Sequence, residues 1–208
     1  MSDIEPADFW EERYAGRSQV WSGRVNEALA AVASTLPAGR VLDLGCGEGG
    51  DAIWLAEHGW SVTAVDISTT AIERGRRAAL ERGLADRIAW VASDLGAWRT
   101  EARFDLVCSC FLHSPVALPR GEILRAAAQL VAPGGRLLIV SHAAAPPWAS
   151  QLHGHHHRFP TPAEQLAELE LDPGWLVHLA ETRRRSATGP DGVPAELEDS
   201  IVLLQRPA

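Results

Sequence analysis

The chain has 208 residues, of which 46% are hydrophobic and 22% charged, and its formal net charge at pH 7 is −8. This length suits one domain with a full core, because domains typically hold roughly 100–200 residues. No apolar run approaches the ~20 residues of a membrane span, and the acidic start is unlike a signal peptide. The negative charge argues against nucleic-acid binding, which relies on positive side chains that neutralise phosphates. We therefore expect neither a membrane nor a nucleic acid as partner.

The use of cysteine and lysine narrows the class of protein further. Three cysteines are too few for a disulfide-stabilised scaffold, so we expect a reducing, cytoplasmic environment. Because all 19 basic residues are arginine, Schiff-base chemistry on lysine and the lysine of a P-loop are both excluded.

Strand-like and helix-like segments alternate along the first two thirds of the chain. Short apolar segments predict strands at residues 40–44, 60–65, 88–92, 104–109 and 136–141. The segments between them have helical periodicity, and glycine follows the expected helix ends at Gly59 and Gly83. Residues 133–135, Pro-Gly-Gly, are expected to end a further helix. This alternation predicts an α/β fold, in which helices cover both faces of a mostly parallel sheet.

The last third of the chain has a different composition. Residues 142–160 are rich in Ala, Pro and His without a clean period, and we expect a long loop or lid. Thr161 and Glu164 have the spacing of a capping box, which predicts a short helix. Two strands are then expected at residues 175–181 and 200–205. A polar connection at residues 182–199 is expected to join them. Because this connection is too short for a crossover helix, we expect an antiparallel pair that closes the sheet.

A glycine-rich turn between the first strand and the first helix carries most of the functional information. Residues 43–50 read Asp-Leu-Gly-Cys-Gly-Glu-Gly-Gly. Glycine lets the backbone turn sharply and lets a ligand approach it closely. The glycines Gly45, Gly47 and Gly49 have Gly-x-Gly-x-Gly spacing, whereas a pyrophosphate site has Gly-x-Gly-x-x-Gly. Asp43 disfavours a diphosphate and suits a ligand with cationic groups, such as an ammonium and a sulfonium.

Acidic residues near the ends of the second and third strands add hydrogen-bond acceptors. Asp66, followed by Ile67, suits the two hydroxyls of a ribose, and Asp94 with Leu95 suits an adenine edge. The carboxyl ends of neighbouring parallel strands meet at one edge of a sheet, where open α/β sheets bind ligands. Cys46, inside the turn, is expected to face the ligand with its backbone.

These motifs resemble those of the class I S-adenosylmethionine-dependent methyltransferases. The segments that carry the resemblance, in the family's order, are residues 43–49, Asp66, residues 93–95, residues 104–107 and residues 133–137. The first resembles the family's glycine motif, Asp66 its ribose acid, and residues 93–95 its adenine motif. The resemblance implies a Rossmann-like sheet of seven strands in the order 3-2-1-4-5-7-6, with the seventh strand antiparallel.

The resemblance also implies how the chain is divided. A single methyltransferase domain would span residues 1–208, with an N-terminal cap at 1–37, a cofactor-binding core at 38–141, and a lid segment with closing strands at 142–208. Residues 9–14 and Trp21 are similar to the cap of small-molecule methyltransferases of the tellurite-resistance and thiopurine group. Trp21 is therefore a candidate for the cofactor site.

Two histidines are the candidate catalytic residues. His113 and His142 follow the fourth and fifth strands, and imidazole titrates near neutral pH, so either is a candidate general base. Binding or loop packing is the alternative role for both. Cys110 is expected at the mouth of the cofactor site, with packing as a small apolar residue as the alternative. The histidines in residues 153–157 lack a neighbouring Cys or Asp for a tetrahedral set, so no metal site is expected.

Taken together, the resemblance implies methyl transfer from S-adenosylmethionine to a small-molecule acceptor. Two alternatives stay open. A module with this fold could bind the cofactor without catalysis, because aligned methyl transfer makes no catalytic residue compulsory. A nicotinamide-dependent oxidoreductase would share the fold and Asp66, but it predicts the other glycine spacing and no Asp43. The acceptor atom also stays open among oxygen, nitrogen, sulfur, carbon and a metalloid.

Overall fold

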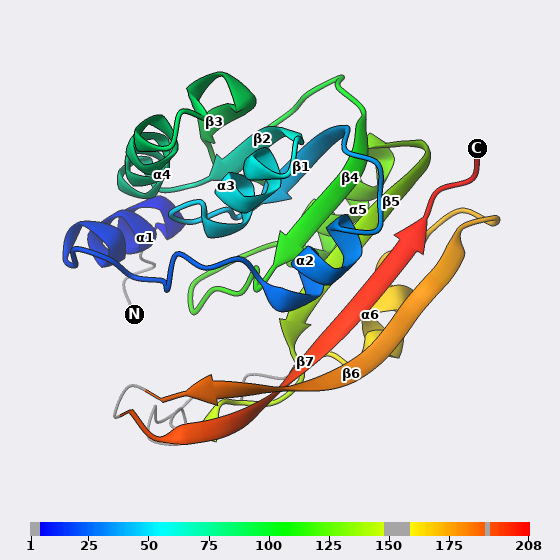
Figure 1. The fold of residues 1–208 in the computed structure, drawn as a ribbon. Coiled ribbons are helices and arrows are strands. Elements are labelled where there is room, and N and C mark those ends of the chain that lie inside the picture. Colours follow the sequence, from blue (N-terminus) through cyan, green and yellow to red (C-terminus); the bar gives the residue numbers. More distant parts are fainter. Residues whose placement is uncertain (1–4, 148–158, 190–191) are drawn as a thin grey trace.

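The computed structural model describes residues 5–147, 159–189 and 192–208, and Figure 1 shows the course of the chain. Its strands form a seven-stranded sheet in the order β3-β2-β1-β4-β5-β7-β6. These strands are β1 (Arg40–Leu44), β2 (Ser61–Asp66), β3 (Ile88–Ala92), β4 (Phe104–Cys110), β5 (Val131–His142), β6 (Leu176–Thr188) and β7 (Pro194–Gln205). β1 to β5 pair in parallel, whereas β7 runs antiparallel to both of its neighbours. The predicted strand order and the antiparallel seventh strand are confirmed.

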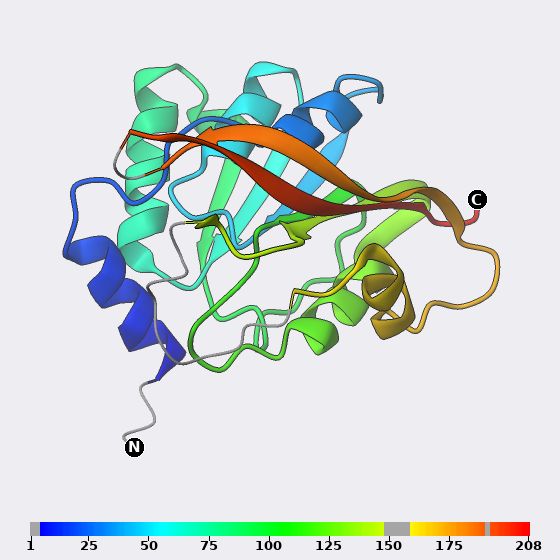
Figure 2. The same ribbon diagram turned by 90° about the horizontal axis from the view of Figure 1, so that it is seen from below.

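Helices cover both faces of this sheet, as Figure 2 shows. They are α1 (Pro6–Ala15), α2 (Glu27–Ala33), α3 (Gly50–Glu57), α4 (Thr69–Glu81), the 3-10 helix η1 (Ala85–Arg87), α5 (Arg120–Leu130) and α6 (Pro162–Glu168). Neighbouring residues of β1 point to opposite faces, so Val41 packs with α2 and α3 while Leu42 packs with α5. Two apolar cores result, one on each face of the sheet. No helix among the described residues is long and apolar enough to span a membrane.

The C-terminal hairpin is longer than the sequence predicts. The prediction of a polar connection at residues 182–199 is wrong. Most of this segment belongs to β6 and β7, which pair as far as Thr188 and Pro194. β5 pairs with β7 only from Gln205 to Asp199, so the end of the hairpin extends beyond the body of the sheet (Figure 1). Every residue on β6 is exposed or only partly buried. The apolar alternation that marks a half-buried strand is therefore absent there.

The start of β5 also differs from the prediction. The strand begins at Val131, which pairs with Phe104, and not at residue 136. The register shifts between Phe104 and Leu106, so the Pro-Gly-Gly segment forms an irregularity inside the strand. The outer strand β6 has β7 on one side and no other strand of the described chain on its outer side.

Candidate active site

The glycine turn joins β1 to α3 at the carboxyl edge of the sheet. Gly45, Gly47 and Gly49 have φ angles of 71°, 53° and 83°, in the left-handed region that favours glycine. The backbone N–H groups of Gly45 and Cys46 both donate to the carbonyl of Val65, at 2.8 and 3.1 Å. The turn is therefore tied to the end of β2, beside the acid that ends this strand.

The space next to Gly47 is filled by the N-terminal cap. A Cβ atom on Gly47 would lie 3.0 Å from the hydroxyl of Tyr14 and 3.1 Å from the indole of Trp21. The indole N–H of Trp21 in turn donates to the Tyr14 hydroxyl at 2.8 Å. Trp21 thus lies against the glycine turn, where the sequence predicts it, although 47% of the residue is exposed.

Asp66 lies beside the turn, as the sequence predicts. Its Oδ2 accepts the backbone N–H of Gly47 at 2.8 Å, and its Oδ1 accepts that of Ser68 at 3.0 Å. Burial raises the pKa of Asp66 above its ordinary value, and these backbone donors oppose that effect. Ile67 follows at the start of the connection to α4 and is partly buried.

Asp43 has an unpaired oxygen in the core of the site. The residue is only 2% exposed, and its Oδ2 is buried without a hydrogen-bond partner among the described residues. Its Oδ1 accepts the thiol of Cys108 at 3.7 Å. Burial, followed by the negative charge of Asp51, raises the pKa of Asp43 well above its usual range. A buried carboxylate oxygen without a partner is costly, so this atom is suited to a donor or cation on a ligand.

The cysteines around Asp43 are not suited to nucleophilic chemistry. Burial raises the pKa of the Cys46, Cys108 and Cys110 thiols well above the usual thiol range, and neighbouring acids raise it further. A thiol held in its protonated form is a poor nucleophile. Cys110, at the end of β4, hydrogen-bonds with the side chain of Asp51.

Asp94 lies at the end of β3 on the same edge of the sheet. It is exposed, and its Oδ1 accepts the N–H of Gly96 at 2.8 Å. Leu95 packs partly against the core below. The backbone N–H of Ser93 donates to the carbonyl of Asp66 at 2.8 Å, which keeps the two acidic strand ends adjacent.

Two glutamates hold the N-terminal cap against the glycine turn and α4. The sequence does not predict either of them for the site. The Glu48 carboxylate accepts the backbone N–H groups of Val20 and Trp21, both at 3.0 Å, and pairs with Arg74 at 2.9 Å. Glu11, on α1, accepts the hydroxyl of Ser68 at 2.7 Å and thereby reaches the N-terminus of α4. No local sequence pattern indicates these contacts, because each joins residues that are 26 or more positions apart.

Arg13 is a further candidate from α1. Its guanidinium lies 5.6 Å from the ring centroid of Trp10 and 5.8 Å from that of Trp21. Its Nε is buried and has no hydrogen-bond partner among the described residues. A cation in this position is suited to an anionic group on a ligand.

The structure brings the two candidate histidines together. His142, the last residue of β5, stacks on Phe111 and on His113, with centroid distances of 4.4 and 5.7 Å. The ring of Phe159 lies edge-on to both histidines. The backbone N–H of His142 donates to Nε2 of His113 at 3.3 Å.

Asp199 joins this group from β7 and is not among the residues that the sequence predicts for the site. Its Oδ1 lies 3.6 Å from Nδ1 of His142, and its Oδ2 accepts from Nε of Arg185 at 2.5 Å. Asp199 falls in the segment expected to be a polar connection, and only the β5–β7 register places it opposite His142. The local sequence contains no signal for that register.

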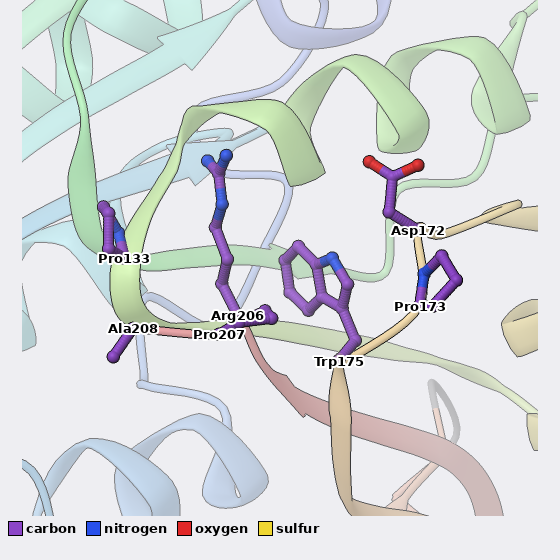
Figure 3. A pocket seen from close by; sticks show the side chains of 7 residues that line it. All are labelled: Pro133, Asp172, Pro173, Trp175, Arg206, Pro207 and Ala208. Carbon is purple, nitrogen blue, oxygen red and sulfur yellow. The ribbon is translucent and has the colours of Figure 1, made fainter.

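Two cavities lie outside the glycine turn. One, of about 410 Å³, lies near the histidines and is lined by His113, Arg120, Pro160, Glu164 and Glu168. The other, of about 290 Å³, is shown in Figure 3, where the side chains of Trp175 and Arg206 line it. Because Pro133 also lines it, the second cavity lies near the beginning of β5, at the opposite edge of the sheet from the strand ends described above.

Part of the expected lid lies outside the described residues, including Trp148 and the histidines in residues 153–157. Within the described ranges, no group of three or more His, Cys, Asp or Glu side chains could hold a metal ion.

Known proteins share both the sequence motifs and the fold. Residues 41–135 match the family described as a methyltransferase domain. A 2-heptyl-1-hydroxyquinolin-4(1H)-one methyltransferase from Mycobacteroides abscessus is 35% identical over 158 residues, which are 73% of this chain and 65% of that protein. A 27-O-demethylrifamycin SV methyltransferase from Amycolatopsis mediterranei is 31% identical over 134 residues, 63% of this chain and 48% of that protein. The chain thus covers less than two thirds of the length of both relatives.

The solved structure of the N-methyltransferase NodS from Bradyrhizobium japonicum WM9, in complex with S-adenosylhomocysteine, has the same fold. The TM-score is 0.71 at 18% identity, and the match covers 98% of this chain and 100% of that chain. The fold and the motifs of the glycine turn define a Rossmann-like methyltransferase domain. Residues 41–135 match a methyltransferase domain, and the whole chain shares the fold of the class I methyltransferases, whose cofactor is S-adenosylmethionine.

The residues at the glycine turn fit this cofactor. The unpaired Oδ2 of Asp43 offers an acceptor to an ammonium group, and the carboxylate of Asp66 is close enough to the turn to accept from ribose hydroxyls. The narrower resemblance to the tellurite-resistance and thiopurine group stays a prediction.

Proposed function

We propose that this protein transfers the methyl group of S-adenosylmethionine to a small-molecule acceptor. The observation that carries the proposal is the buried, unpaired Oδ2 of Asp43 below the glycine turn, because it suits the cationic end of the cofactor. Both relatives described above are methyltransferases named for small molecules. We further propose a cytoplasmic protein without a nucleic-acid or membrane partner, in keeping with the net charge of −8.

The glycine turn and the neighbouring acids would hold the cofactor. Asp43 would accept from its ammonium group, Asp66 from its ribose hydroxyls, and Asp94 with Leu95 would border the adenine. Arg13 would face the carboxylate of the methionine part, because its buried Nε lacks a partner among the described residues. The other residues proposed to border the cofactor are Gly45, Cys46, Gly47, Gly49, Ile67, Cys110 and Trp21.

Bound S-adenosylmethionine supplies a methyl group that its sulfonium already activates, so the main contribution of the chain is alignment and exclusion of water. The indole N–H of Trp10 donates to Ser114 Oγ at 3.2 Å and joins α1 to the loop after β4. This contact would let the N-terminal cap cover the acceptor as well as the cofactor. His142 or His113 would accept a proton from the acceptor.

Calorimetry with S-adenosylhomocysteine, with NAD as control, tests the cofactor. Transfer of labelled methyl groups to a panel of phenols, amines, thiols and metalloid oxyanions tests the activity. We expect micromolar binding of S-adenosylhomocysteine, no binding of NAD, and transfer to at least one acceptor. Cofactor binding without any transfer would identify a binding module, and preferential binding of NAD would identify an oxidoreductase.

A further inference from the structure

The pair formed by His142 and Asp199 lies at the edge of the sheet that carries the glycine turn. His142 is the last residue of β5, and its direct partner in the antiparallel register of β7 is Asp199. The carboxyl ends of the central strands also carry the glycine turn, so the pair and the proposed cofactor site share one edge of the sheet. The side chain of His142 is 25% exposed and that of Asp199 is 6% exposed. The imidazole thus reaches the surface of the site, and the carboxylate lies behind it.

Two unsatisfied atoms face each other across this pair. Nδ1 of His142 and Oδ1 of Asp199 are both buried, and neither has a hydrogen-bond partner among the described residues. They are 3.6 Å apart, and an approach of about 0.7 Å would form an N–H···O hydrogen bond that satisfies both. Hydrogen bonds of catalytic groups are often long in the absence of substrate and shorten when it binds.

Arg185 restricts the orientation of the Asp199 carboxylate. Nε of Arg185 lies 2.5 Å from Oδ2 of Asp199, and the guanidinium carbon lies 5.4 Å from the ring centroid of Phe111. One oxygen of Asp199 is thereby occupied, which leaves the other for His142. A carboxylate on Nδ1–H leaves the lone pair of the imidazole on Nε2, and Nε2 is then the basic atom.

The other candidate base has a different role. Nε2 of His113 accepts the backbone N–H of His142 at 3.3 Å, so the lone pair of this nitrogen is already used. His113 also lines the cavity of about 410 Å³, together with Arg120 and Glu164. The imidazole of His142 stacks on this histidine and on Phe111, and Phe159 lies edge-on to both histidine rings.

We infer that Asp199 is a positioning residue that orients His142 as the general base for a hydroxyl group on an aromatic acceptor. The inference rests on the proposed methyl transfer and adds the acceptor class. The rings of Phe111, His113 and Phe159 provide flat surfaces for an aromatic ring, and the adjacent cavity has the size of a small-ligand pocket. A general base helps only an acceptor that still carries its proton, such as a phenol, and not an acceptor that is already an anion.

In the proposed step the acceptor loses its proton as it gains the methyl group. The acceptor oxygen forms a bond to the methyl carbon while the S–CH₃ bond breaks, and the electron pair of that bond stays on sulfur. The O–H bond breaks, and its proton goes to Nε2 of His142. The imidazolium is stabilised by Asp199 and returns its proton to solvent after the products leave.

The test compares acceptors that differ in acidity. A series of phenols from 4-methylphenol to 4-nitrophenol is methylated at pH 7.5 by the full chain and by the variants His142→Gln and Asp199→Asn. General-base catalysis typically contributes about 10²–10⁴-fold, so we expect losses of this size for 4-methylphenol. For 4-nitrophenol, most of which is ionised at this pH, we expect losses below about tenfold. The matched controls His178→Gln and Asp86→Asn should leave all rates unchanged.

A second measurement reports on Asp199 without turnover. Nitrogen-15 spectra of the ligand-free protein should show Nδ1–H as the tautomer of His142, and Asp199→Asn should abolish that preference while the fold is retained. Among the residues that the structure describes, the titratable and charged groups that face His142 are His113 and Asp199, with Arg185 behind Asp199. The variant His113→Gln removes the neighbouring imidazole, so that the nitrogen-15 signals of His142 can be followed separately from those of His113.

The outcomes distinguish the inference from the function on which it rests. Equal losses across the phenol series, or an Nε2–H tautomer, would overturn the role of His142 as base. A protein that binds S-adenosylhomocysteine but methylates no phenol would overturn the acceptor class. If it then methylates a thiol, an amine or a metalloid, the proposed function stands without this inference. Failure to bind S-adenosylhomocysteine would overturn both.

Discussion

The indole of Trp90 occupies the space that a side chain on Gly49 would need. A Cβ atom on Gly49, or on Gly75 of α4, would overlap the six-membered ring of this tryptophan. The two glycines therefore form a recess between the turn and α4 into which Trp90, on β3, projects. The glycine at position 49 thus has a packing role in addition to its proposed place beside the cofactor.

Gly49→Ala should destabilise the fold by about 2–4 kcal/mol, because overpacking costs roughly 1–3 kcal/mol and the left-handed backbone costs about 1 kcal/mol more. Urea unfolding measures this change. Gly83→Ala is the matched control, because Gly83 has a φ of 70° but no atom lies within 4 Å of its added Cβ. Equal destabilisation by the two substitutions would contradict the packing role of Gly49.

Gly47→Ala should weaken binding of S-adenosylhomocysteine at least tenfold. The added methyl group would lie 3.0 Å from the Tyr14 hydroxyl and 3.1 Å from Trp21, so the N-terminal cap must shift. Calorimetry measures the affinity, and the tryptophan emission spectrum reports the shift of Trp21. An unchanged affinity in a folded variant would mean that the position of the cap does not affect the cofactor site.

Asp66→Ala should weaken binding of S-adenosylhomocysteine by about 1–3 kcal/mol, because charge-assisted hydrogen bonds to the ribose are lost. Calorimetry on the folded variant checks this value. Asp86→Ala, an exposed acid of η1, is the control and should bind normally. Normal binding by the Asp66 variant would remove this acid from the site.

Asp43→Asn should stabilise the ligand-free protein at pH 8 while it weakens cofactor binding. The pKa of Asp43 is raised in the folded state, so its favourable contribution to stability is complete only at acidic pH. That contribution is lost as the pH rises through the raised pKa. The melting temperature between pH 5 and 8 should therefore fall less steeply in the variant than in the parent protein. Parallel curves would show that Asp43 does not carry this pH dependence.

Glu11→Gln should loosen α1 while the central sheet stays intact. The Glu11 carboxylate accepts from Ser68 and from both the backbone and the side chain of Thr70, and it joins α1 to the start of α4. Hydrogen exchange of the α1 amides should become faster, because local opening costs less free energy. Glu12→Gln, on the exposed side of the same helix, should leave exchange unchanged.

The parts of the site that follow strand ends could be predicted from the sequence. Gly47 and Asp66 lie side by side because Asp66 ends β2 and Gly47 follows the end of its parallel neighbour β1, and the sequence contains both the strands and the turn. Local motifs are sufficient there, because the geometry of parallel strands supplies the long-range contact.

The pairs that depend on the register of distant elements could not be predicted. His142 meets Asp199 only because β5 and β7 pair in one particular register, and nothing in either segment specifies it. Glu48 meets Trp21 because the N-terminal cap folds back over the turn. The protruding part of β6 could not be predicted for a related reason, because none of its residues is fully buried and the strand therefore has no apolar period.

The outer edge of β6 is the part of the described sheet where a second copy of the chain would be able to pair. A long strand with unpaired backbone groups is a template for edge-to-edge association. In the middle of this strand, the side chains of Arg183 and Arg184 are 48% and 70% exposed and lie on opposite faces. If two copies paired antiparallel about this point, like charges would face each other on both sides of the new sheet. The two arginines, which pair with Glu181 and Glu198 of the same hairpin, would disfavour such an edge-to-edge contact between two molecules.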